Sequence, residues 1–596
     1  MRRTLESCKQ ALKQGPLVGP WLRKGNEQLW ESYRQAREMA RGTQASLYDV
    51  LNVKHDISLT VPQQWNAILR NSNSLLKSLP QPHNPGVLFM TVWGGKNSPA
   101  LSALESILAV SIRLRGVESI ALACSKALPA CSYDPLGNHR LPPPAAYAST
   151  GLSAVRCRDC MHSLHSYYDR LPVTLLEFGE FSCPDDLQQV LRLVDSVSPD
   201  NYRSFVYRDV KVGEHAYASV LRALGRGTLL DDPYHWWLLR RHLIAAMLVT
   251  NVTERALQTL RPRRMMAVHG IYADHGTACE VARKHDVPVV VYSVPYRRDA
   301  IVLCHGDTYH RALVTEPTAL WENLVLTPEQ ERRLDSYIDS RRHGGQDSLT
   351  YHPNPIEDEI SLVQALGLSR DRPIISLFTN VIWDAQVYHS YNAFDNLLDW
   401  LFQTIEYFSR RTDLQLVVRI HPAEVKAVKK TEQPVAEEIA QRFPILPAHI
   451  KVIGPESDLS SYTLVKISHA ALIYGTKMGL EIALRGVPVI IAGESMNRGK
   501  GFTYDVTSAE QYFDLLDHIA ELPQNSPDMF SRARKYAYHF YFRRQIDFPF
   551  LTGYKPGSPE LLRLSFKSLD DLMPGRDTNL DRICEGILTG SEFVVA

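Results

Sequence analysis

The sequence predicts an α/β protein made of two Rossmann-like domains that face each other across a cleft. Apolar strands alternate with helical segments in two stretches, at 83–325 and at 371–545, and this alternation is typical of parallel sheets. The polar, helix-like start at 1–82 predicts a helical N-terminal extension that carries no chemistry. A linker or hinge at 326–370 and a C-terminal tail at 546–596 complete the expected domain limits.

The first domain begins with the apolar segment GVLFMTVWGG at 86–95, which has the pattern of a buried strand. A helix-like segment and a second strand at 119–124 follow, as in the opening of a Rossmann-like fold. Residues from about 150 to 260 have a helical pattern. The strand–helix–strand pattern resumes at 264–292 and repeats the architecture of the second domain. Two such halves imply a cleft between them.

The linker prediction rests on the charged segment LTPEQERRLDSYIDSRR and on the glycines and prolines that follow it. The second domain starts with the apolar strand at 373–378 and ends near the aromatic stretch YAYHFYFRRQIDFPF. Its clearest unit, at 470–505, has the pattern of a strand, a turn, a helix, a strand and a glycine-rich loop.

An anion site is expected at the start of the helix in this unit, because the first backbone N–H groups of a helix have no partner within it. Thr476 would add a hydroxyl and Lys477 a positive charge, and both suit a diphosphate. Glu481 is expected on a solvent-facing position about one turn later, where its carboxylate would accept hydrogen bonds from sugar hydroxyls. In the alternative interpretation, this is an ordinary strand–helix–strand unit with a solvated Glu481 and glycines that only close turns.

Three spaced motifs in the second domain resemble the capsule polysaccharide biosynthesis proteins, a family of glycosyltransferases with the GT-B fold. They are FTNVIWDA at 378–385, VVRIHPAE at 417–424, and TKMGLEIALRGVPVI at 476–490, which is followed by RGKGFTYD at 498–505. The resemblance implies transfer of a sugar from a CMP- or UDP-linked donor to a surface polysaccharide or lipid-linked glycan, with no metal needed for catalysis. It implies that the donor contacts Asn380, Asp384, Glu424, Thr476, Lys477, Gly479, Glu481, Gly499 and Lys500.

Catalytic groups are expected at the carboxyl ends of the strands, where open α/β sheets bind their ligands. In the second domain, Arg419 or His421 would stabilise the charge that develops on the leaving phosphate, although His421 would alternatively be a structural residue bonded to backbone. In the first domain, one of His269, Asp274 and His275 would be the base for the acceptor hydroxyl. His269 and Asp274 are preferred, because a strand-end imidazole or a carboxylate is more easily held in one orientation.

Four cysteines form a second, incomplete pattern. Cys157 and Cys160 have C-x-x-C spacing, and with Cys124 and Cys131 they would make a structural zinc site. The six residues between Cys124 and Cys131 exceed the usual spacing of such a pair. Buried thiols or a redox pair are the alternative interpretation.

Composition restricts the class of partner. Lys plus Arg number 66 and Asp plus Glu number 65, and this balance argues against a nucleic-acid partner. No apolar run approaches the length of a membrane span, and the start of the chain lacks the apolar core of a signal peptide. We therefore expect a cytoplasmic protein, with peripheral association at the inner membrane face with a polysaccharide assembly complex. A nucleotide-sugar epimerase of similar fold and a noncatalytic scaffold of a biosynthesis or export complex remain the alternatives.

Overall fold

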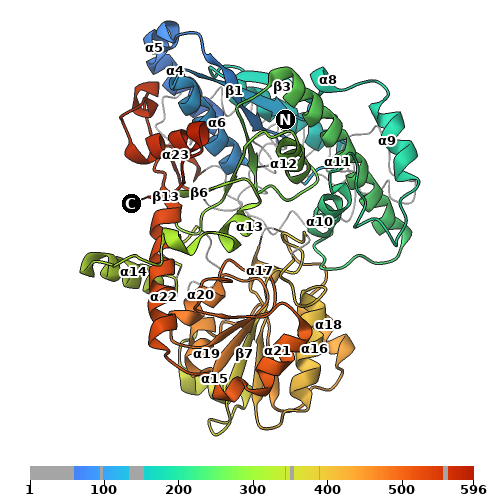
Figure 1. Ribbon diagram of the computed structural model, residues 1–596, viewed down its shortest axis with the longest axis vertical. Coiled ribbons are helices and arrows are strands. Elements are labelled where there is room, and N and C mark those ends of the chain that lie inside the picture. The colour runs from blue at the N-terminus through green and yellow to red at the C-terminus, as the bar shows by residue number, and fades with distance from the viewer. Residues whose placement is uncertain are drawn as a thin grey trace, which may run out of the picture. The chain divides into compact units, whose positions relative to one another are not determined.

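A seven-stranded sheet and a six-stranded sheet form the framework of the protein (Figure 1). The computed structural model describes residues 59–93, 98–132, 153–342, 344–348, 355–387, 390–427, 429–554 and 561–595, with backbone alone at 153–156. The helical extension predicted at 1–82 therefore lies outside the described residues up to residue 58.

The first sheet is parallel over five strands in the order β5-β4-β1-β2-β3, and β6 and β13 extend it as antiparallel strands. The connections reverse direction between β1 and β4, and such a reversal is where open α/β sheets bind ligands. The strands are β1 His83–Met90, β2 Val117–Ala123, β3 Thr174–Glu177, β4 Arg264–Val268, β5 Val289–Ser293, β6 Ala300–His305 and β13 Gln545–Asp547.

The second sheet is parallel throughout, in the order β12-β11-β10-β7-β8-β9, and its connections reverse between β10 and β7. Strands β7, β8, β10 and β11 are buried at every position, as expected for a parallel sheet with helices on both faces. The strands are β7 Ile374–Phe378, β8 Gln415–Arg419, β9 Ile450–Ile453, β10 Ala470–Ile473, β11 Val489–Ile491 and β12 Tyr504–Asp505.

The helices alternate with these strands along the chain. Those before the connector are α4 Val61–Asn71, α5 Asn73–Ser78, α6 Pro99–Leu114, α7 Ser153–Tyr168, α8 Phe178–Phe181, α9 Asp186–Val194, α10 Val212–Leu224, α11 Pro233–Leu260, α12 His275–Lys284 and α13 Tyr309–Val314. The connector, here residues 326–370, contains α14 Pro328–Ser340 and α15 Glu359–Leu366. The later helices are α16 Leu397–Ser409, α17 Ala423–Lys426, α18 Val435–Arg442, α19 Ser461–Ile467, α20 Met478–Ala483, α21 Ala509–Asp517, α22 Pro527–Tyr538, a π-helical turn His539–Arg544, and α23 Thr578–Thr589.

The end of the chain returns to the first sheet. Helix α22 leads through the π-helical turn into β13, which pairs with β6 (Figure 1). Helix α23 then packs through Leu580, Ile583 and Ile587 into the apolar core of that sheet. A short antiparallel pair, β14 Leu551–Thr552 and β15 Arg563–Leu564, lies between them. The residues predicted as a C-terminal tail therefore cover the first sheet.

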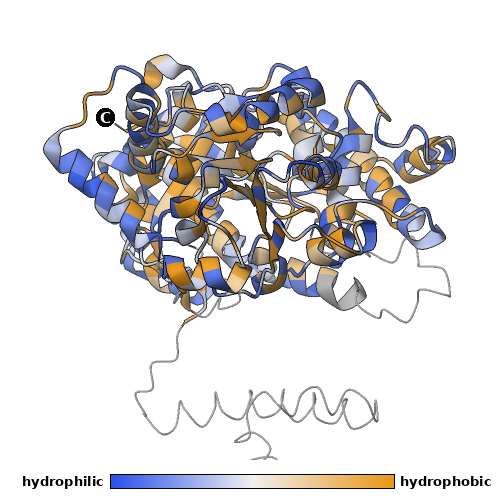
Figure 2. Ribbon diagram, turned by 90° about the horizontal axis from the view of Figure 1, so that it is seen from below, coloured by the Kyte–Doolittle hydropathy of each residue, from blue (hydrophilic) through white to orange (hydrophobic). Residues whose placement is uncertain are grey.

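Apolar residues concentrate in the strands and in the helix faces turned toward them, while hydrophilic residues lie outside (Figure 2). Residues from Leu59 onward form one compact unit that contains both sheets. The prediction of an α/β protein with two Rossmann-like sheets, as in a GT-B fold, is confirmed; the second sheet is parallel throughout, and the first has a parallel core of five strands. Among the helices of the described segments, none combines the length and apolarity needed to cross a membrane.

Candidate functional site

A cavity of about 590 Å³ lies between the carboxyl ends of the two sheets. The first sheet contributes residues that follow β4 and β5, and the second sheet contributes residues that follow β7, β8 and β10. The connector supplies a third part of the lining through Arg341 and Asp347. The topological reversal of the second sheet, between β10 and β7, therefore opens toward this space, which is where open α/β sheets bind their ligands.

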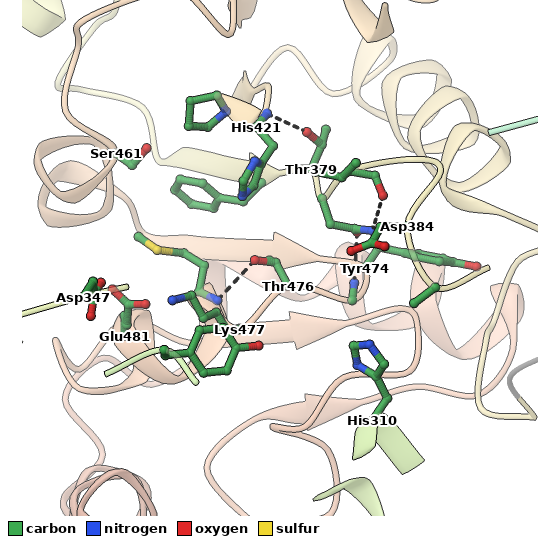
Figure 3. Close-up of a pocket in the computed structure, with 18 of the residues that line it drawn as sticks. His310, Asp347, Thr379, Asp384, His421, Ser461, Tyr474, Thr476, Lys477 and Glu481 are labelled. Carbon is green, nitrogen blue, oxygen red and sulfur yellow. Dashed lines mark hydrogen bonds between the residues drawn. The ribbon is translucent and has the colours of Figure 1, made fainter. Parts of the chain in front are cut away.

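The second-sheet wall is built by hydrogen bonds between neighbouring strand ends (Figure 3). Asn380, after β7, accepts a 3.3 Å hydrogen bond at Oδ1 from the N–H of Gly475, after β10. Thr476 Oγ1 accepts a 3.3 Å hydrogen bond from the N–H of Met478, the first residue of α20. Asn380 and Thr476 line the cavity, and each also orders the loop that carries it.

Arg419, the last residue of β8, and His421, just after the strand, line the same wall. The N–H of Ala423 donates to His421 Nδ1 at 3.1 Å, so the neutral imidazole carries its proton on Nε2. The N–H of His421 donates to Thr379 Oγ1 at 2.9 Å, which fixes the loop (Figure 3). A fixed Nε2–H is a donor suited to a developing negative charge.

Arg419 holds together the loops behind this wall. Its Nη1 donates to the carbonyl of Gly454 at 2.6 Å, and its Nη2 donates to the carbonyl of Ser457 at 3.0 Å. Burial lowers the pKa of Arg419 to about 10, while Asp458 favours the charged form, so the guanidinium remains positive at neutral pH. Arg419 therefore adds a positive charge to the site and holds its loops in place by hydrogen bonds.

Lys477 lines the cavity beside α20, with Nζ 4.1 Å from the ring centre of Tyr296, a first-sheet residue. Burial lowers the pKa of Lys477 to about 8, and Arg341 adds to that effect. Glu481 lines the cavity one turn further along, yet it is only 2% exposed. The solvent-facing position expected for Glu481 is therefore wrong, because Arg341 and Tyr462 cover its carboxylate.

His269 forms the centre of the first-sheet wall. It lies at the end of β4 with a φ of +56°, and Gly270 follows with a φ of +72°, so the chain turns sharply at the strand end. Its Nδ1 lies 3.4 Å from Ser293 Oγ, and its ring lies 5.8 Å from that of Tyr309. Burial and the nearby charge of Arg222 lower the pKa of His269 to about 3, so the imidazole is neutral at physiological pH. A bound anion would raise that pKa toward the range of a general base.

Asp384 joins the two walls. Its Oδ1 accepts a 2.6 Å hydrogen bond from Arg222 Nη1 on α10 and a 2.8 Å hydrogen bond from the hydroxyl of Tyr272. Burial alone would raise the pKa of Asp384, but Arg222 and Tyr272 lower it, so the carboxylate stays ionised. Asp384 was expected to contact the donor, and in this structure it contacts the first-sheet side of the cavity.

Asp274, expected as an acceptor base, is only 1% exposed and does not line the cavity. Its carboxylate accepts hydrogen bonds from Trp93 Nε1 at 2.9 Å, from Ser132 N–H and Oγ–H at 3.1 and 2.8 Å, and from the N–H of His275 at 2.9 Å. Burial would raise the pKa of Asp274, but His275 and these donors hold it well below its usual range. Asp274 caps α12 and ties together the strand ends of the first sheet.

Four residues expected to bind the donor likewise lie outside the cavity lining. Glu424 accepts from the N–H of Val435 at 3.2 Å, and Lys500 Nζ donates to the carbonyls of Val314 and Glu316 at 3.2 Å. A Cβ at Gly479 would lie 2.6 Å from Asn497 Nδ2, so this glycine permits close packing. Gly499 has a φ of +73° and donates to Asp505 Oδ2 at 2.7 Å, which closes a turn.

The predicted zinc site gains no support. Cys124 lies near the Cys160 and Cys157 thiols, and burial raises the pKa of Cys124 to about 12, which favours the protonated thiol. In the segments with described coordinates, no group of three or more His, Cys, Asp or Glu side chains is arranged to hold a metal. Zinc at Cys124, Cys131, Cys157 and Cys160 stays a prediction.

Several cavity residues have no counterpart in the sequence predictions. Arg341 and Asp347 come from the connector, whose charged and glycine-bearing pattern predicts only a linker or hinge. Arg222 comes from the helical stretch of the first domain, where only its helical period was recognised. Further lining residues of this kind are Tyr272, Ser293, Tyr309, His310, Ser460, Ser461 and Tyr462.

No protein-family model and no curated protein matches this sequence. Among solved structures, the chain is similar to KpsC from Thermosulfurimonas dismutans, described as a beta Kdo 2,4 transferase, with 13% identity and a TM-score of 0.30 over 46% of this chain and 79% of that chain. It is also similar to a putative UDP-N-acetylglucosamine 2-epimerase from Listeria monocytogenes, with 11% identity and a TM-score of 0.25 over 85% of this chain and 98% of that chain.

A third similar structure is the spinosyn rhamnosyltransferase SpnG complexed with spinosyn aglycone, with 10% identity and a TM-score of 0.22 over 76% of this chain and 95% of that chain. Transferases and epimerases both occur among these neighbours. Similarity at this level does not choose between them, so the choice depends on the geometry of the cavity.

Proposed function

We propose that this protein is a glycosyltransferase that moves a sugar from a nucleotide-sugar donor, held by the second sheet, to a glycan or lipid-linked acceptor held against the first sheet. One observation carries the proposal: a single cavity has an oriented imidazole donor, His421, on one wall and a neutral imidazole, His269, on the other. Sugar transfer from a nucleotide needs a hydrogen-bond donor that stabilises the leaving phosphate and a base that takes the proton of the incoming hydroxyl.

The leaving-group side consists of His421, Arg419 and Lys477. In this proposal Lys477 pairs with a donor phosphate, and His421 donates its Nε2 proton in a hydrogen bond to an oxygen on which charge develops. These fixed side chains would supply the charge stabilisation that a metal ion supplies in other enzymes. We therefore propose that catalysis needs no metal ion. We propose that the sugar donor is CMP-linked or UDP-linked.

The acceptor side consists of His269 with Tyr272 and Tyr309. His269 would take the proton of the acceptor hydroxyl, and a bound donor phosphate would favour this by raising the pKa of the imidazole. Tyrosine rings around it offer flat apolar faces against which sugar rings pack. A glycan or lipid-linked acceptor fits this lining, and a cytoplasmic location with peripheral attachment to a membrane-bound assembly complex remains an expectation.

An epimerase is the second candidate, and one observation favours it. Asp384 follows a strand of the second sheet and lines the same cavity as His269 and His310 of the first domain, so acid and base groups from both walls converge on one space. Such groups could remove and return a proton on opposite faces of one sugar. An epimerase would change a nucleotide-sugar when no acceptor is present, whereas a transferase would not.

Calorimetric titration with UDP, CDP, CMP and GDP tests the donor site. Wild-type protein should bind at least one of these nucleotides, and Lys477→Met should weaken that binding about tenfold or more, because the phosphate loses its charge partner. Lys466→Met is the matched control, since Lys466 is exposed on α19 and pairs with Glu359. No binding of any nucleotide by the wild type would favour the noncatalytic scaffold over both enzymes.

A further inference from the structure

Arg341 is a buried arginine that the connector inserts between the two sheets. It directly follows α14, and its Nη1 donates to Asp347 Oδ1 at 2.7 Å and to the hydroxyl of Tyr337 at 3.0 Å. Its Nη2 lies 3.1 Å from Glu481 Oε1 on α20. A charged residue with only 8% exposure is stable here because carboxylates from two segments face it.

Glu481 lies between two cations that compete for it. Its Oε1 pairs with Arg341, and its Oε2 accepts a 2.6 Å hydrogen bond from the hydroxyl of Tyr462. Lys477 lies four residues before Glu481, a spacing at which side chains beside a helix meet. Lys477 nevertheless makes no ion pair with any residue for which the structure gives side chains; its contact is with the ring of Tyr296. Lys477, Asp347 and Glu481 lie together on this side of the cavity (Figure 3).

This arrangement decides which cation faces the ligand. Resting on the donor-phosphate role of Lys477 proposed above, we propose that Arg341 holds the carboxylate of Glu481 so that Lys477 stays available to the phosphate of the donor. Arg341 is then a positioning residue that does not contact the donor. Nucleotide affinity depends through it on the connector, a segment outside both sheets.

Charge counting supports the same conclusion. Arg341 and Lys477 are balanced by Glu481 and Asp347. Burial would raise the pKa of Glu481, but Arg341, Lys477 and Tyr462 lower it to about 2, so the carboxylate is ionised at neutral pH. Removing Arg341 alone would leave one cation, Lys477, beside two carboxylates. That excess of negative charge would neutralise the positive charge of Lys477 and repel a phosphate.

A compensating second substitution tests this role. Inorganic pyrophosphate and UDP are the calorimetric probes, and the full-length protein is used. Arg341→Met should weaken binding on the order of tenfold or more, because Glu481 then pairs with Lys477. Arg341→Met combined with Glu481→Gln should return the affinity to within about threefold of wild type, because the competing carboxylate is gone. Damage to packing alone would not be repaired by a second substitution.

Arg534→Met is the matched control. Arg534 ties α22 to α14 through Glu331 and Asp335 but does not line the cavity, so its loss loosens the connector without changing the charges around Lys477. Its affinity should equal that of the wild type. Two results would overturn the positioning role of Arg341 but not the donor site: equal affinities of wild type and Arg341→Met, or a double variant that binds no more tightly than Arg341→Met. A wild type that binds neither probe would overturn the donor site itself and this role with it.

Discussion

Arg222 of α10 donates a 2.6 Å hydrogen bond from Nη1 to Oδ1 of Asp384, and this ion pair joins a helix of the first sheet to a strand-end loop of the second. The hydroxyl of Tyr272 donates to the same carboxylate oxygen at 2.8 Å. All three side chains line the cavity. The contact therefore bridges the walls that would carry donor and acceptor.

Arg222→Met should lower turnover about tenfold while nucleotide affinity changes less than about twofold, because the walls lose their fixed spacing but the donor wall is intact. The melting temperature should change little, since the pair is partly exposed and contributes about 0–1 kcal/mol. Arg208→Met is the control, because Arg208 has similar exposure and pairs with Glu254. A parallel loss of affinity and turnover would place Arg222 in donor binding instead.

His421→Ala should reduce donor hydrolysis and sugar transfer by about 10²-fold, because both reactions lose the Nε2–H donor to the leaving phosphate. His421→Gln should recover part of the rate, since its amide N–H can occupy a similar place. Steady-state kinetics check both variants, and His518→Ala, at an exposed position, is the control. Wild-type rates in His421→Ala would show that the imidazole is structural.

Glu481→Ala should destabilise the protein by about 3 kcal/mol, since it removes one of the carboxylates that neutralise the buried Arg341. Urea unfolding measures the change in free energy. Glu331→Ala, which removes a partly exposed partner of Arg534, should cost about 0–1 kcal/mol. Equal stability of wild type and Glu481→Ala would contradict the buried position found here.

Glu424→Gln should change how stability depends on pH. Burial raises the pKa of Glu424 from 4.5 to about 7, so the folded state binds this proton more tightly than the unfolded state. Wild-type stability should therefore fall as pH rises from about 4.5 through 7, and the variant should lack this component.

At pH 8 the Glu424→Gln variant should be more stable than the wild type by about 1–3 kcal/mol, with a smaller difference at pH 5. Urea titrations at the two pH values measure this, with Glu406→Gln, exposed on α16, as the control. A difference that is the same at both values would show that Glu424 titrates normally.

The sequence correctly predicted several residues of the second-sheet wall, and the reason is physical. Motifs that directly follow β7, β8 and β10 must converge, because the carboxyl ends of neighbouring parallel strands meet at one edge. Asn380, His421, Thr476 and Lys477 were found in this way, and all four line the cavity.

Residues whose role depends on distant packing were not predictable. Asp274 follows a strand just as His269 does, yet Trp93 and Ser132 occupy its carboxylate. No local pattern distinguishes that outcome from a catalytic position. Arg341 was missed because a charged helical segment is usually solvated, and only the tertiary fold brings it to Glu481.

The proposed sugar transfer is tested most directly by following nucleotide release and sugar products by NMR when nucleotide-sugars are incubated with and without glycan and lipid-linked acceptors. We expect nucleotide release that depends on an acceptor and a loss of activity of about 10²- to 10⁴-fold in His269→Ala with nucleotide affinity retained. We expect no loss in His305→Ala, whose imidazole bonds to the carbonyl of Ser591. Conversion of a nucleotide-sugar into its epimer without any acceptor would contradict the transferase and establish the epimerase. Full transfer activity in His269→Ala would show that the acceptor base lies elsewhere in the cavity.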